Sequence, residues 1–251
     1  MDNTMYVGVS KQMILRRELD IVANNIANAD TTGFKVESLM TADDPEYPVH
    51  AAIGSQPIQY AIDNGVARDF TEGKLEQTGA PLDLAIDGQA FFTVSTSSGN
   101  RYTRDGRFTT DAQGHLTTQA GDPVLDASGS QITLNPLAGP PSIAHDGTIT
   151  QSIAGQTTEQ VVGKIGVVRF DSLSSLTKDG DGLYDNTSSS TPQAAPDARI
   201  QQGMLETSNV QPVLQITDLI RIQRAYESIS NMISTTSDLS KTAIERLGSS
   251  Q

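Results

Sequence analysis

The sequence contains no cysteine and no tryptophan, and aromatic residues make up only 5% of its 251 residues. Without cysteine, the chain can form no disulfide framework, thiolate nucleophile or cysteine-ligated metal site. The scarcity of aromatic residues argues against an aromatic-lined ligand pocket or a base-stacking platform.

Basic residues are also few, since 17 Lys and Arg against 30 Asp and Glu give a net charge of −13. Nucleic acids and anionic membranes bind basic surfaces, so the sequence predicts no nucleic-acid partner. No apolar run approaches the roughly 20 residues that span a bilayer, so we expect no membrane insertion. Lys11, Arg16 and Arg17 interrupt the N-terminal apolar stretch, so we expect no cleaved signal peptide.

Turn-forming residues are concentrated in the middle of the chain. Residues 41–204 hold 18 of the 21 glycines, 10 of the 11 prolines and most of the excess negative charge. The two ends are poor in both residue types, which indicates helical ends around a turn-rich centre.

Both ends carry apolar residues at helical spacing. Leu15, Leu19, Val22 and Ile26 follow a 4-3-4 spacing, and Gly33 is a plausible helix stop. Near the C-terminus, a 3-4 alternation runs through Leu219, Ile222, Tyr226, Ile229, Ile233, Thr236, Ser240, Ala243 and Leu247. This alternation is typical of a coiled-coil seam.

The middle of the chain alternates at the period of a β-strand. Leu82, Leu84 and Ile86 alternate with polar or small residues, which predicts a half-buried strand. Asp105-Gly106 is a two-residue signal for a hairpin turn. The polar stretch at 185–198 predicts a linker.

The predicted fold class is therefore mixed α and β, with N- and C-terminal coiled-coil helices packed together and a central, mostly antiparallel β domain. The expected segments are an N-terminal core helix at 1–35, an extended connecting region at 36–78 and a central β domain at 79–185. A linker and return strand at 186–210 and a C-terminal core helix at 211–251 complete the chain.

The helical ends have more apolar surface than one partner helix covers. Ile14, Ile21, Val213, Ile216 and Ile220 lie off the two seams, which indicates a second buried face. Contacts between unlike patches propagate into open helical assemblies, so we expect self-association of the chain ends. The alternative is an ordinary globular protein whose two helices cover one face of the β domain.

The predicted assembly interface combines the two seams with a polar cluster. Asn24, Asn25 and Asn28 could fix the register between subunits, or lie in a frayed last turn with their amides in water. The interface residues are Leu15, Leu19, Val22, Asn24, Asn25, Ile26, Asn28, Leu219, Ile222, Tyr226, Ile229 and Ile233.

No other cluster predicts chemistry, so we expect no catalytic residue, cofactor or metal. Asp179, Asp181 and Asp185 lack the bidentate position of a calcium loop and favour a solvated turn. Arg101, Arg104 and Arg107 favour surface ion pairs, with contact to a neighbouring subunit as an alternative. Three scattered histidines, His50, His115 and His145, favour exposed loop positions.

Three separated motifs resemble the bacterial flagellar rod and hook protein family. They are DIVANNIANADTTGFK at 20–35, EGKLEQTGAPLDLAIDG at 72–88 with YTRDG at 102–106, and QGMLE at 202–206 with SNV at 208–210 and QRAYE at 223–227. They occur in the family's order and span almost the whole chain. The opening residues, Pro212 after the SNV motif and DGLY at 181–184 resemble the proximal rod type more than the distal rod type.

This resemblance implies a structural subunit of the flagellar rod in the periplasm, exported unfolded by the flagellar type III apparatus. It implies copies of itself and neighbouring rod proteins as partners, and terminal helices that line the axial core. The competing classes are a secreted adhesive or binding β-domain protein with helical oligomerisation arms, and a cell-wall hydrolase.

Overall fold

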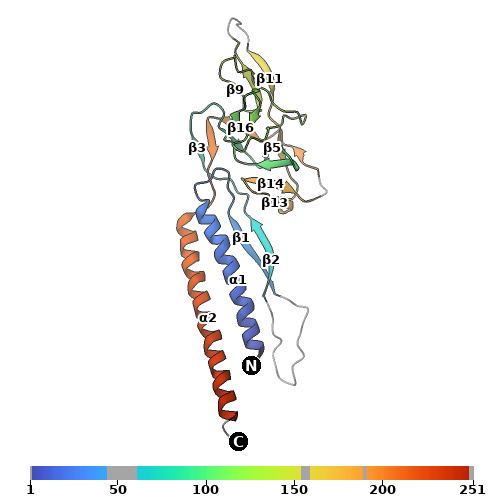
Figure 1. The fold of residues 1–251 in the computed structure, drawn as a ribbon. Helices are drawn as coiled ribbons and strands as arrows, with labels where there is room; N and C mark the ends of the chain where they lie inside the picture. The colour runs from blue at the N-terminus through green and yellow to red at the C-terminus, as the bar shows by residue number, and fades with distance from the viewer. Residues whose placement is uncertain (1, 44–60, 154–158, 189–190, 249–251) are drawn as a thin grey trace. The chain divides into compact units, whose positions relative to one another are not determined.

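The computed structural model describes residues 2–43, 61–153, 159–188 and 191–248, which fall into two compact units (Figure 1). We call the unit of Met1–Ala27, Glu37–Arg68 and Val210–Gln251 the helical unit. The unit of Asn28–Val36 and Asp69–Asn209 is the β unit. Each unit therefore combines segments from both halves of the chain.

Two long helices dominate the helical unit. Helices α1 (Asp2–Ala27) and α2 (Pro212–Gly248) lie side by side (Figure 1). They run antiparallel, because Asn25 donates to Gln215 at one end while Gly8 lies against Ile233 towards the other. Two terminal helices and a largely antiparallel β region confirm the predicted mixed α and β class.

A β-hairpin completes the helical unit. Strands β1 (Glu37–Asp43) and β2 (Ala61–Arg68) pair antiparallel, with a bulge in the register between Leu39 and Thr41. The predicted extended region at 36–78 thus contains a hairpin, and its residues 44–60 lie outside the described residues. Glu37 and Arg68 form an ion pair of 2.8 Å at the end of the hairpin.

Helix α1 ends at Ala27, six residues before the predicted stop at Gly33. The main-chain nitrogen and the side chain of Thr31 both donate to Asn28, and this local turn competes with further helix. Gly33 serves a later turn with φ +68, where a Cβ would lie 2.6 Å from the carbonyl carbon of Arg104. The predicted glycine is needed for a close backbone approach and not for the helix end.

The β unit is built from antiparallel strands. A six-stranded sheet has the order β13-β14-β6-β5-β12-β15, a three-stranded sheet has the order β11-β10-β9, and three strand pairs are β4 with β16, β3 with β17 and β7 with β8. The bounds are β3 Leu75–Gln77, β4 Leu84–Asp87, β5 Phe91–Thr96, β6 Gly99–Thr103, β7 Thr109–Thr110, β8 Leu116–Thr117, β9 Ser142–Ile143, β10 Thr148–Gln151, β11 Gln160–Lys164, β12 Val167–Arg169, a 3₁₀ turn at Leu173–Ser175, β13 Leu176–Lys178, β14 Leu183–Asn186, β15 Gln193–Ala194, β16 Arg199–Gln202 and β17 Met204–Glu206.

The core of the β unit buries β4 on both faces. Leu84, Ala85 and Ile86 are all buried, so the prediction of a half-buried strand was wrong. Ala85 was predicted to face outward. Because its side chain is small and apolar, this face of the strand can be buried as well. A second cluster packs Phe70, Phe91 and Tyr184 edge to face, with ring centroids 5.4 to 6.0 Å apart.

The hairpin predicted at Asp105-Gly106 is absent from the described residues. Strand β6 before it pairs with β5 and β14, while β7 after it pairs with β8, and neither Asp105 nor Gly106 has a positive φ. Gly106 is instead packed against the main chain of Leu84, where a Cβ would lie 1.6 Å from the carbonyl oxygen.

The stretch predicted as a linker at 185–198 contains strand β15, while β16 and β17 lie after it, in the part of 186–210 predicted as a return strand. β15, β16 and β17 pair with β12, β4 and β3, and both Ala195 and Ile200 are buried in the core. The polar composition at 185–198 gave no signal for β15, whose partner β12 lies about 25 residues earlier in the chain. The partners of β16 and β17 lie about 115 and 130 residues earlier.

Candidate assembly interface

The two predicted seams meet each other within the chain. Leu15, Val22 and Ile222 are buried between the helices, and Ile222 is only 1% exposed. Partly buried around them are Leu19, Ile26, Leu219, Ala225, Tyr226 and Ile229, and Ile233 lies further along against Gly8. The three buried side chains therefore have little surface left for a neighbouring molecule.

The seam weakens along the second half of α2. Thr236 and Ser240 turn their hydroxyl groups back to main-chain oxygens one helical turn earlier. The side chains of Ala243 and Leu247, predicted to continue the seam, lie outside the described residues.

The three asparagines have different surroundings. Asn25 is buried, and its amide donates to the main-chain oxygen of Glu37 at 2.8 Å and to the side chain of Gln215 at 3.0 Å. Its oxygen accepts from the main-chain nitrogen of Glu37, so Asn25 ties α1 to β1 and α2 in one chain. Asn24 is exposed, and Asn28 lies in the turn after α1, so a register role between subunits stays a prediction for Asn24.

The additional apolar positions separate into a covered and an uncovered group. Ile14 and Ile21 are buried, on a helix that contacts β1 and β2 and whose Arg17 reaches Asp63 of β2. The second buried face of α1 is therefore closed within this chain. By contrast, Val213 is 76% exposed, and Ile216 and Ile220 are nearly half exposed.

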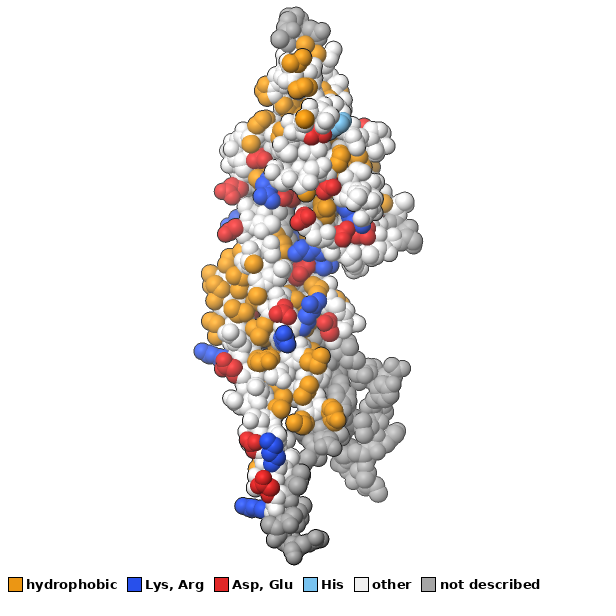
Figure 2. All heavy atoms as spheres, viewed as in Figure 1, with side chains coloured by type: hydrophobic (Ala, Val, Ile, Leu, Met, Phe, Trp, Pro, Cys, Tyr) orange, Lys and Arg blue, Asp and Glu red, His pale blue; other side chains and the backbone are white. Residues whose placement is uncertain are grey.

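Exposed apolar side chains form two patches, one on each helix. The α2 patch comprises Val213, Ile216 and Ile220, and the α1 patch comprises Met5, Tyr6, Val9 and Met13. Figure 2 shows hydrophobic side chains gathered over the first turns of α2 and again near the start of α1. Contiguous apolar surface on a protein exterior marks an interaction site.

A buried ionic cluster lies in the β unit, and sequence reasoning missed it. Glu206 is 1% exposed, and its carboxylate contacts Lys35 Nζ at 2.6 Å and Arg104 at 3.1 Å. Arg104 was predicted to form a surface ion pair, but it is buried, lies 5.2 Å from the centre of the Phe91 ring and also donates to the main-chain oxygen of Gly88. We call Lys35, Arg104 and Glu206 the buried ion triad.

The triad links segments of the β unit that lie far apart in the sequence. Lys35 also donates to the main-chain oxygen of Thr71, and the main-chain nitrogen of Gly73 donates to Glu206. Burial lowers the pKa of Lys35, while the neighbouring Glu206 carboxylate acts in the opposite direction. Two buried cations share one carboxylate. Main-chain oxygens of Thr71 and Gly88 accept further hydrogen bonds from Lys35 and Arg104, and so offset part of the excess positive charge.

The other two arginines singled out in the sequence form ion pairs in which one side chain is exposed and the other is largely covered. Arg101 contacts Asp179 at 2.6 Å and Asp185 at 3.4 Å, and Arg107 contacts Asp105 at 2.7 Å. Within the described ranges, no group of three or more His, Cys, Asp or Glu is placed to hold a metal ion.

The histidines make separate contacts. His115 contacts Asp111 at 2.8 Å, and His145 contacts the main-chain oxygen of Ile200 at 3.1 Å. His50 lies outside the described residues.

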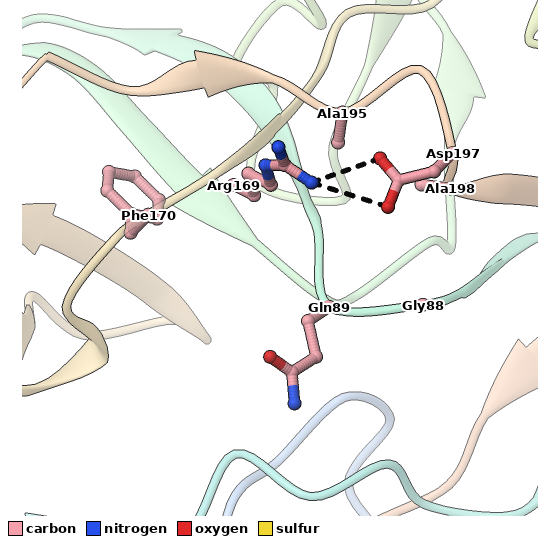
Figure 3. Close-up of a pocket in the computed structure, with 7 residues that line it drawn as sticks. All are labelled: Gly88, Gln89, Arg169, Phe170, Ala195, Asp197 and Ala198. Carbon is pink, nitrogen blue, oxygen red and sulfur yellow. Dashed lines mark hydrogen bonds and ion pairs between the residues drawn. The ribbon is translucent and has the colours of Figure 1, made fainter.

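One pocket of about 300 Å³ opens on the β unit (Figure 3). Arg169 points across it to Asp197, contacting both carboxylate oxygens at 3.3 Å, while the Gln89 side chain points elsewhere (Figure 3). The two charges satisfy each other, so the pocket presents no unpaired charge of either residue to a ligand.

Three family models match the chain in order. They are described as flagella basal body rod protein at residues 5–35, flagellar hook protein FlgE/F/G D1 domain at 85–151, and flagellar basal body rod FlgEFG protein C-terminal at 201–246. The flagellar basal-body rod protein FlgF of Caulobacter vibrioides is 56% identical over 99% of both chains. The chain belongs to the flagellar basal-body rod protein family. FlgF of Mesorhizobium japonicum is 37% identical over 99% of both chains.

Relatives of a second type are more distant. FlgG of Buchnera aphidicola subsp. Acyrthosiphon pisum is 32% identical over 92% of this chain and 94% of its own. No helix in the described part of this rod-family chain combines the length and apolarity needed to cross a membrane.

The family matches meet in the buried ion triad. Lys35 lies in the first matched segment, Arg104 in the second and Glu206 in the third. The three rod-family segments are thus brought together by one buried carboxylate. The usable signal in the sequence was a charged residue in each motif, Lys35 and Glu206 at the ends of theirs and Arg104 in the middle of YTRDG.

Proposed function

We propose that this chain is a structural subunit of the flagellar basal-body rod, of the FlgF type. The observation that carries the proposal is the 56% identity to Caulobacter FlgF over 99% of both chains. The lower identity to FlgG relatives, 32% for the Buchnera protein, favours the FlgF type. The FlgG type remains the alternative within the family.

Association with other rod proteins and with copies of itself would place the subunit in the periplasmic rod that transmits torque. Export through the flagellar type III apparatus without a cleaved signal peptide belongs to the same proposal. The 3-4 spacing of the α1–α2 seam supports a coiled-coil geometry for the helix pair within the rod.

The experiment is deletion of the gene in the bacterium that carries it, followed by complementation. Loss of motility and of complete rods in isolated basal bodies, both restored by the intact gene, is expected. Motile deletion cells with complete rods would contradict the proposal.

The helix pair has few fully buried side chains for its length. Among the side chains that the structure describes, helices of 26 and 37 residues share a buried cluster of three, Leu15, Val22 and Ile222. Each such side chain contributes about 1.5–3 kcal/mol on burial, whereas ordering a residue costs about 1–2 kcal/mol of backbone entropy. Neighbouring subunits would supply the missing burial.

We therefore expect the helices to order fully only on assembly. Circular dichroism at 222 nm of the dilute, purified chain should correspond to clearly fewer helical residues than the two helices contain, and should rise on assembly. Full helicity in a dilute monomer would count against coupled ordering.

Substitutions on opposite faces of α2 separate folding from assembly. Ile222→Asp buries a charge in the seam, so it should lower helix content and block incorporation into the rod. Ile220→Asp places the charge on the exposed α2 patch, so it should block incorporation with helix content within about 10% of that of the parent chain.

Incorporation is measured by immunoblot of isolated basal bodies, and helix content by circular dichroism of the purified variants. The β unit should stay folded in both variants, as judged by its protease resistance. Normal incorporation of the Ile220→Asp variant would exclude the α2 patch from the interface.

A further inference from the structure

The end of the β unit supplies strand partners to its earliest strands. We call residues 199–209 the closing segment, which comprises β16, β17 and the residues up to Asn209. Strands β4 and β16 form one two-stranded sheet, and β3 and β17 form another. Because β4 is buried in the core, one hydrogen-bonding edge of a core strand is completed by a segment more than a hundred residues later in the chain.

Side chains of the closing segment also contact loops from the middle of the chain. Gln202 donates to the main-chain oxygens of Pro81 and Pro141, each at 2.8 Å. Its own side-chain oxygen accepts from the main-chain nitrogen of Ile143 at 3.1 Å. Ile200 is 1% exposed and belongs to the main hydrophobic cluster. The closing segment therefore completes both the hydrogen bonding and the apolar core of the unit.

The main chain packs closely around this segment. A Cβ on Gly73 would lie 1.8 Å from the main-chain oxygen of Thr207. The side chain of Asn209 accepts from the main-chain nitrogen of Val36 and donates to the main-chain oxygen of Asp69, each at 2.8 Å. The closing segment thus joins the first part of the β unit, which ends at Val36, to the second part, which begins at Asp69.

The charge of Glu206 adds to this dependence. Its carboxylate lies between Lys35 and Arg104 in the buried ion triad, where each side chain is at most 1% exposed. If the rest of the unit folded without the closing segment, the two cations would repel each other beside the unpaired edges of β3 and β4. Uncompensated charge and unpaired main-chain groups both oppose folding, so the remainder of the unit is unstable alone.

From these contacts we propose that residues 28–36 and 69–198 have no stable fold until the closing segment docks on them. The β unit then folds in one cooperative step in which its first and last parts meet. A chain that emerges N-terminus first stays unfolded here until Glu206 has emerged, because that residue lies 171 positions after Lys35. This inference goes beyond the proposed rod function. In a chain exported unfolded, it would postpone folding of the β unit until only the C-terminal helix has still to pass.

The alternative is a closing segment that opens by itself while the other strands stay folded, as separate parts of many proteins do. Hydrogen exchange of the full-length chain distinguishes the two, because each amide exchanges through the opening that exposes it. The reference stretch is 116–125, where the amides of Leu116, Val124 and Leu125 donate to residues outside the closing segment.

Exchange of the dilute, full-length chain is followed by mass spectrometry at several urea concentrations below the unfolding transition. We expect the slowest amides of the closing segment and of 116–125 to have protection factors within about tenfold of each other, with the same urea dependence. A closing segment that exchanges more than about tenfold faster, through an opening that leaves 116–125 protected, would overturn the proposal. A full-length chain without protection in either stretch would overturn it as well, because docking would then not suffice.

A substitution in the closing segment gives a second readout. Glu206→Gln should lower the protection of both stretches by the same factor, about a hundredfold or more. The matched control Asp197→Asn lies just before the segment in an exposed pair with Arg169, and should change both by less than about fivefold. Loss of protection confined to the closing segment would contradict cooperative closure.

If Glu206→Gln does not accumulate as a folded chain, Gln202→Ala replaces it, since it removes hydrogen bonds without changing the charge. An equal loss of protection in both stretches is again the expected result, and a loss in the closing segment alone would again overturn the proposal. None of these outcomes bears on the rod function, which deletion and complementation test separately.

Discussion

Replacing Glu206 by Gln is expected to destabilise the β unit by about 3–5 kcal/mol, because it leaves two buried cations without their shared carboxylate. Lys35 at 2.6 Å and Arg104 at 3.1 Å would then repel each other in a site that excludes water. The glutamine amide has nearly the same shape, so the loss reports charge and not a cavity. Urea denaturation followed by NMR signals of β5 residues measures the change.

The matched control is the same carboxylate-to-amide change in an exposed pair. Asp197→Asn removes the partner of Arg169, and both side chains are largely solvated, so the change should stay below about 1 kcal/mol. Equal effects of the two substitutions would show that burial of the triad has no energetic weight. Restoration of stability by combining Glu206→Gln with Lys35→Met would show that the excess positive charge is the cause.

The second large effect is expected from Gly106→Ala. A Cβ at this position would lie 1.6 Å from the main-chain oxygen of Leu84, which is itself in the buried strand β4. Because main-chain atoms on both sides must move, we expect a loss of several kcal/mol of unfolding free energy or failure to accumulate folded protein. Thermal unfolding and soluble yield measure it.

Gly163→Ala is the matched control, since this glycine has no positive φ and open space around its Cβ position. Reduced entropy of the unfolded chain should leave that variant as stable as the parent chain or up to about 1 kcal/mol more stable. A Gly106→Ala variant as stable as the control would contradict the close packing of the two main chains.

The helical ends were predictable because their information is local. Apolar residues three and four positions apart specify one face of a helix, whatever lies elsewhere in the chain. Leu15, Val22 and Ile222 are therefore buried where their spacing placed them. The end of α1 was less predictable, because the hydrogen bonds of Thr31 to Asn28 compete with the helix there.

The β unit was predictable in class and not in detail. Short alternating segments with turn glycines indicated antiparallel strands, but strand pairing depends on residues far apart in the chain. Ile200 of β16 pairs with Ile86 of β4, more than a hundred residues earlier. The spacing of apolar residues in the 185–198 stretch and in β16 does not indicate which distant strand each segment pairs with.

By itself, then, the sequence determined the helical ends, the acidic turn-rich centre and, through its three motifs, the family. The tertiary structure alone decided which apolar side chains are buried within the chain and which stay exposed, where a neighbouring molecule could contact them. Ile14 is covered and Ile216 is not, although both lie off their seams, because the described part of the hairpin packs against the second face of α1. It also decided that Arg104 is a core residue, since the charge that compensates it, Glu206, lies about a hundred residues away in sequence and 3.1 Å away in space.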